Sequence, residues 1–98
     1  MIVELADIRI KYEQAAVFER NVQHALATIF PQAKGFIGSN FQKCIETPDR
    51  YVLLFSREKL ENHTVDFRGS TLLAEWRAFV GDFFAQPPYV QHFAAVPR

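Results

Sequence analysis

The chain has 98 residues, with eleven basic and eleven acidic side chains and a formal net charge of zero, so it lacks the surplus positive charge that attracts nucleic acid. No stretch approaches the roughly 20 apolar residues of a membrane span, and the amino terminus lacks the basic and apolar regions of a signal peptide. The single cysteine, Cys44, cannot form an internal disulfide, and we expect a soluble cytoplasmic protein without membrane contact.

The first third of the chain predicts a strand followed by a helix. Residues 2–11 alternate with a period of two and place apolar groups on both faces of the predicted strand. Apolar residues then recur every three or four positions from Ala15 to Ile29, which predicts an amphipathic helix. The helix should end at Phe30-Pro31, because proline disfavours a helical conformation in the residue before it.

A hairpin is predicted next. Residues 36–46 form its first strand, residues 47–50 its turn, and residues 51–55 an apolar second strand. Alternation places Ile37 with Phe41 on one face of the first strand, and Phe36 with Asn40 and Gln42 on the other. The second face is half polar, as the wall of a ligand cavity would be.

The last third predicts two helical segments and a strand. A short helical segment carries His63, Phe67 and Arg68, and Gly69 breaks it. Ser70 stands at the expected N-cap of a longer helix, whose apolar stripe includes Trp76. Pro87-Pro88 ends that helix, and residues 89–96 form a strand with His92 on the same face as Val90.

The predicted order is therefore βαββαβ in a single domain, residues 1–98. It predicts an α+β, ferredoxin-like fold, in which both helices cover one face of an antiparallel sheet. A chain of this size is marginally stable alone, and apolar residues lie on both strand faces. We expect a second copy to stack on the uncovered face, with the candidate pocket between the two sheets.

Several short motifs resemble those of a known family, the antibiotic biosynthesis monooxygenase (ABM) family of dimeric α/β barrels. The resemblance covers nearly the whole chain and is carried by Gly35-Phe-Ile-Gly38, Pro48-Asp-Arg-Tyr51, Glu61-Asn-His63, Phe67-Arg-Gly-Ser70, Glu75-Trp-Arg77 and Pro87-Pro-Tyr-Val-Gln-His-Phe93. It implies a homodimer around a hydrophobic cavity and, as in characterised relatives, oxygenation of phenols or quinols by O₂ without a metal or flavin cofactor.

The same superfamily contains haem-degrading enzymes that use an asparagine, tryptophan and histidine triad. Phe67 stands at the position of that tryptophan, and Trp76-Arg77 occupies the region of the histidine. The resemblance therefore does not extend to haem degradation.

Oxygenation without a cofactor needs a base, a charge stabiliser and an apolar enclosure. His63 is the leading candidate for the base and His92 the second, since imidazole titrates near neutrality; either could instead be a packing or interface histidine. Arg68 could stabilise an anionic intermediate, or could pair with Asp66 or Glu75. Five further residues are candidates for substrate binding, with core packing the alternative for Trp76: Asn40, Gln42, Tyr51, Phe67 and Trp76.

No HxH, HxxxH or CxxC spacing occurs, so we expect no metal site. The favoured function is a homodimeric, cofactor-independent monooxygenase that acts on a small aromatic or quinol-like molecule and O₂. The rival function is a non-catalytic dimer of the same fold, which binds a small molecule or serves in assembly.

Overall fold

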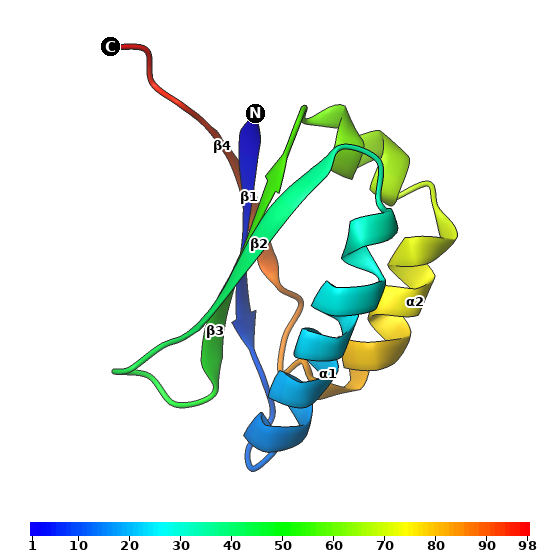
Figure 1. The fold of residues 1–98 in the computed structure, drawn as a ribbon. Helices are drawn as coiled ribbons and strands as arrows, with labels where there is room; N and C mark the ends of the chain where they lie inside the picture. Colours follow the sequence, from blue (N-terminus) through cyan, green and yellow to red (C-terminus); the bar gives the residue numbers. More distant parts are fainter.

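Four antiparallel strands form one sheet, and both α-helices lie on the same face of it (Figure 1). The computed structural model describes residues 1–98. The strands run in the order β2-β3-β1-β4, and the predicted ferredoxin-like βαββαβ fold is confirmed. Their bounds are Ile2–Arg9 for β1, Phe36–Lys43 for β2, Arg50–Arg57 for β3 and Tyr89–Ala94 for β4, and those of the helices are Ala15–Thr28 for α1 and Thr71–Val80 for α2.

Three short helical segments connect these elements. They are η1, Phe30–Gln32, and η3, Gly81–Phe83, both 3₁₀-helical, and η2, Asn62–Phe67, a π-helical turn. No helix has the length and apolarity needed to cross a membrane. Ser70 is the N-cap residue of α2, as predicted, but its hydroxyl donates to the carbonyl oxygen of Phe67 at 2.7 Å and caps no N–H of α2.

The two faces of the sheet differ in what covers them. The helix-covered face buries alternate residues of β1 and β3, including Ala6, Ile8, Leu53 and Phe55. The opposite face, here called the open face, carries Val3, Leu5, Val52, Leu54, Tyr89 and Phe93. Within one chain nothing covers the open face (Figure 1).

The face assignment predicted for β2 is wrong at its amino-terminal end. The pairing of β2 with β3 shifts between Phe36 and Gly38, so a β-bulge makes Ile37 an extra residue. Phe36 therefore packs against the core beside Phe41, while Ile37 is exposed. A strict period of two cannot anticipate this change of face.

Gly35 and Asn62 make a close contact that joins the start of β2 to η2. Gly35 has φ +75°, and a β-carbon at this position would lie 2.0 Å from Asn62 Oδ1. Asn62 Oδ1 accepts a hydrogen bond from the Lys59 N–H at 2.9 Å, and Nδ2 donates to Asp66 Oδ2 at 3.1 Å. The glycine thus makes room for the side chain that holds both ends of η2.

We predict that Gly35→Ala destabilises the protein by about 2 kcal/mol or more, because it adds left-handed backbone strain to the steric overlap with Asn62. Gly81→Ala is the matched control, since Gly81 has φ −57° and nothing within 4 Å of the added carbon. Urea unfolding at one fixed protein concentration measures both variants. Equal stability of the two variants would contradict the role given to Gly35.

Candidate active site

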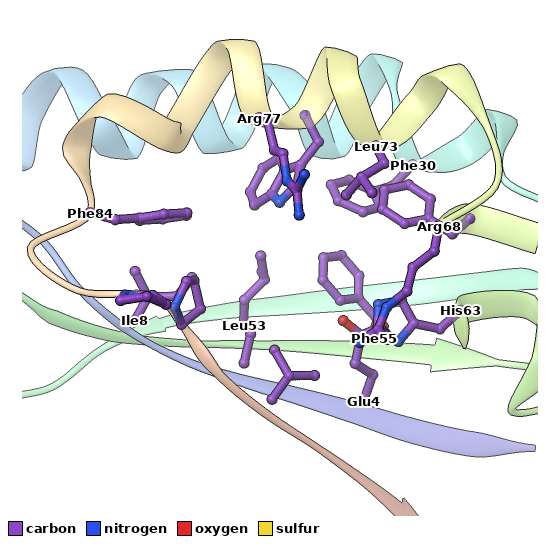
Figure 2. A pocket seen from close by; sticks show the side chains of 16 residues that line it. Glu4, Ile8, Phe30, Leu53, Phe55, His63, Arg68, Leu73, Arg77 and Phe84 are labelled. Carbon is purple, nitrogen blue, oxygen red and sulfur yellow. Dashed lines mark ion pairs between the residues drawn. The ribbon is translucent and has the colours of Figure 1, made fainter. Parts of the chain in front are cut away.

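A cavity of about 430 Å³ lies between the sheet and the helical layer of a single chain (Figure 2). Most of its walls come from β1, β3, η2, α2 and the segment before β4, and ten of its sixteen lining residues are hydrophobic. The sixteen lining residues are Glu4, Ala6, Ile8, Phe30, Leu53, Phe55, His63, Phe67, Arg68, Leu73, Trp76, Arg77, Phe84, Pro87, Pro88 and Val90. The pocket expected between two sheets would need a second chain and stays a prediction, whereas this cavity lies within one chain. The helices do not pack fully onto the sheet, and the space is left on their side.

One end of the cavity is polar, because charged side chains lie on the inward faces of two neighbouring strands. Arg57 is fully buried and donates from Nε to Glu4 Oε1 at 3.0 Å. Its guanidinium lies 5.3 Å from the ring centroid of Phe55 and 5.1 Å from that of Phe67, which are cation–π distances. Nη1 and Nη2 of Arg57 have no hydrogen-bond partner.

His63 completes this polar end and connects it to His92. The two rings form a hydrogen bond of 2.8 Å between His63 Nδ1 and His92 Nε2, and Glu4 Oε1 lies 3.5 Å from the same Nδ1. A proton on Nδ1 can be donated to both His92 Nε2 and Glu4 Oε1. The ring nitrogen of His63 that then keeps a free lone pair is Nε2. His63 lines the cavity, whereas His92 is not among its lining residues.

The surroundings of His63 keep the imidazole neutral. Burial, followed by the charges of Arg57 and Arg68, lowers the pKa of His63 to about 4. Burial also raises the pKa of Glu4, although the Arg57 guanidinium opposes this effect. At neutral pH the histidine is therefore an unprotonated group that can accept a proton.

Two arginines reach the cavity from the helical layer. Figure 2 shows Arg77 extending from α2 into the space and Arg68 running towards the end where Glu4 and His63 lie. Neither side chain forms an ion pair. Of the two acids expected as partners of Arg68, Asp66 instead accepts a hydrogen bond from Asn62, and Glu75 forms no ion pair. Both guanidiniums are therefore free to bind a ligand.

The remaining candidate residues divide between the cavity and other places. Phe67 and Trp76 line the cavity, and Trp76 also packs edge-on against Phe30 at 5.0 Å between ring centroids. Asn40 and Gln42 are exposed on the open face and do not reach the cavity. Tyr51 is buried away from it and donates to Glu19 Oε2 at 2.7 Å, while burial and this hydrogen bond raise its pKa.

Three residues of the site did not emerge from the sequence: Glu4, Arg57 and Arg77. The first two have the parity of buried residues in their strands, a signal that becomes informative once the pairing of β1 with β3 is known. Glu4 shares the parity of Ala6 and Ile8 in β1, and Arg57 that of Phe55 in β3. An acid and a base on the inward faces of adjacent strands indicate a buried ion pair.

Glu4, His63 and His92 bring three possible ligand atoms within 4.8 Å of one another. Spacing along the sequence could not show this, because the three residues come from β1, η2 and β4. A divalent ion there would share the Glu4 carboxylate with the buried Arg57 guanidinium and lie near Arg68. Two nearby positive charges oppose such binding, so the cluster is better suited to proton transfer.

The fold places the chain among ferredoxin-like α+β proteins, and the cavity with one polar end is the candidate site within the chain. The family model described as antibiotic biosynthesis monooxygenase matches residues 1–64. The chain belongs to this family.

Two relatives match over nearly their full length. The uncharacterized protein YczJ of Bacillus subtilis is 38% identical over 96 residues, which cover 98% of this chain and 100% of YczJ. A crystal structure of an antibiotic biosynthesis monooxygenase-family protein from Bordetella bronchiseptica is 41% identical, with a TM-score of 0.93, and the match covers 98% of this chain and 97% of that one.

SnoaB, a cofactor-independent oxygenase from Streptomyces nogalater, is a more distant structural neighbour. It has 13% identity and a TM-score of 0.76, and the match covers 99% of this chain and 94% of SnoaB. This likeness shows that the two proteins share a fold.

We predict that the buried His63 makes the protein less stable as the pH falls. The folded pKa of about 4 lies below the ordinary value of 6.5, so between these values the unfolded chain binds the extra proton. From pH 7.5 to pH 5.0 this effect should remove about 2 kcal/mol of stability.

Urea unfolding at several pH values should show that His63→Gln lacks this part of the pH dependence. His24→Gln, at an exposed histidine of α1, is the control and should follow the parent protein. A parent-like pH dependence in His63→Gln would show that His63 is not held neutral.

Proposed function

We propose that the protein is a cofactor-independent monooxygenase of a small phenol or quinol-like substrate, which binds in the cavity of each chain. One observation carries this proposal: a neutral histidine and an unpaired arginine share one end of a mostly apolar cavity. Family membership gives the reaction class its support. The apolar walls would exclude water from the reacting centre.

In this proposal His63 is the base. Its Nε2 accepts the hydroxyl proton of the substrate, and the resulting anion is electron-rich enough to transfer an electron to O₂. The hydrogen bond from Nδ1 to His92 holds the ring in the tautomer that leaves Nε2 free. Glu4 Oε1, at 3.5 Å from Nδ1, supports the same tautomer.

Arg68 is the charge stabiliser. Its guanidinium stays protonated and faces the site where negative charge develops, first on the substrate oxygen and then on reduced oxygen. The overall reaction is SH₂ + O₂ → SO + H₂O, in which one oxygen atom enters the substrate and the other leaves as water. The substrate supplies all four electrons, so the reaction needs no external reductant.

The low pKa of His63 favours a second candidate function, binding without turnover. A histidine with a pKa of about 4 is a weak base towards an ordinary phenol. A ligand that stabilises the protein but consumes no oxygen would indicate a non-catalytic binding protein.

We predict that the protein consumes O₂ with a panel of hydroquinones, naphthols and anthrones in buffer treated with a chelator. His63→Gln should lower the rate by about a hundredfold, the lower range of general base catalysis. An oxygen electrode and mass spectrometry of the product in ¹⁸O₂ measure turnover and incorporation.

His24→Gln should retain the parent rate, because His24 is exposed on α1 and does not line the cavity. The circular dichroism of each variant establishes that it is folded. Full activity of folded His63→Gln, or no turnover with any member of the panel, would contradict the proposal.

We further propose that the chain forms a homodimer through its open face. This face combines the half-buried side chains of Leu5 and Leu54 with the exposed rings of Tyr89 and Phe93. Contiguous apolar groups on an uncovered sheet are stabilised when another sheet packs on them. A second copy presents the same surface, so two chains related by a twofold axis can cover each other.

We predict that the parent protein sediments at twice the chain mass of 11.3 kDa and that Leu54→Glu sediments as a monomer. The carboxylate would have to be buried without a partner in the interface. Val17→Glu, on the exposed surface of α1, is the control and should remain dimeric. Analytical ultracentrifugation measures all three, and a monomeric parent protein would refute the dimer.

A further inference from the structure

The cavity carries a surplus of positive charge. Arg57 is compensated by Glu4, with which it forms an ion pair at 3.0 Å, and His63 is neutral at pH 7. Arg57 does not itself line the cavity, and the two arginines that do, Arg68 and Arg77, form no ion pair with an acidic side chain. Two guanidiniums therefore share the mostly apolar lining without a counter-ion from the chain itself.

We propose that the natural ligand is an aromatic acid, a hydroxylated ring system with a carboxylate, and that Arg68 and Arg77 bind its negative charge. This inference rests on the proposed function for the place of the ligand and names the chemical class of its substrate. A guanidinium binds a carboxylate through paired, charge-assisted hydrogen bonds, which a neutral quinol cannot form.

The distribution of side chains along the cavity gives the ligand an orientation. Figure 2 shows Ile8 and Phe84 at one end, Glu4, His63 and Arg68 at the other, and Arg77 above the space between them. An apolar ring system fits the first end, and its hydroxyl group then lies towards His63. A cavity of about 430 Å³ has room for two or three fused rings.

Such a ligand would also change the basicity of His63. The charges of Arg57 and Arg68 help burial to lower the pKa of this histidine. A carboxylate bound beside Arg68 offsets part of that positive charge and raises the pKa towards its ordinary value. The acid would therefore make His63 a better base in the complex than in the free protein.

The test compares 3-hydroxy-2-naphthoate with its methyl ester, which has the same rings and hydroxyl but no charge. We expect isothermal titration calorimetry at pH 7.5 to show that the acid binds at least about tenfold more tightly than the ester. Trp76 is the only tryptophan and lines the cavity, so its single indole N–H resonance reports occupancy of this site.

In the double variant Arg68→Gln/Arg77→Gln the preference for the acid should fall to within about twofold, since the loss of both charges removes the charge-assisted hydrogen bonds. The lysine variants Arg68→Lys and Arg77→Lys should retain part of the preference. Arg20→Gln, at an exposed arginine of α1, should retain all of it. Unchanged melting of the variants excludes a defect in folding.

Any one of three results would overturn the inference. The protein could bind the acid and the ester with equal affinity, the preference for the acid could survive in the double glutamine variant, or the indole resonance could stay unmoved with both compounds. The measurement does not use turnover. An acid that binds as predicted but is never oxidised would contradict the proposed oxygenase function and leave this inference intact.

Discussion

The buried ion pair between Glu4 and Arg57 is the constraint on which the candidate site depends. Taking both charges out of water is costly, and removal of either partner would leave the other uncompensated, at a cost of about 3–5 kcal/mol. The rings of Phe55 and Phe67 flank the guanidinium and recover part of this cost. With Arg57 fixed, the carboxylate is fixed too, and its Oε1 lies 3.5 Å from the ring of His63.

Strand register brings the polar residues together. Glu4 of β1 pairs directly with His92 of β4 on one side and with Phe55 of β3 on the other, and Arg57 follows two residues after Phe55 on the same face. A slip of one residue in either pairing would move these side chains to opposite faces. The contact between Gly35 and Asn62 then holds η2 so that His63 meets this cluster.

The sequence predicted the order of elements and the grouping of alternate residues in β1 and β4, because these strands alternate without interruption. It failed for β2, where one extra residue at Ile37 changes the face of Phe36. Histidine and tryptophan are rare in this chain, which drew attention to His63 and Trp76, and Phe67 and Arg68 were found because they stand in a motif that resembles the family. Glu4 and Arg57 were missed, since charged residues in a strand look solvent-exposed until the pairing of two strands is known. The position of the cavity depends on how closely the helices pack on the sheet, which no local pattern encodes.

Because the cavity lies within one chain, a dimer is not needed to form it, yet the two faces of the sheet are not independent. Successive residues of β4 serve both faces: His92 points towards His63, and Phe93 points to the open face. β4 is an edge strand, paired only with β1, and the chain beyond it has no partner element (Figure 1). An edge strand opens more readily than a central one. A partner subunit seated on Phe93 would restrain β4 and hold His92 against His63, so that association on one face would preserve the geometry of the base on the other.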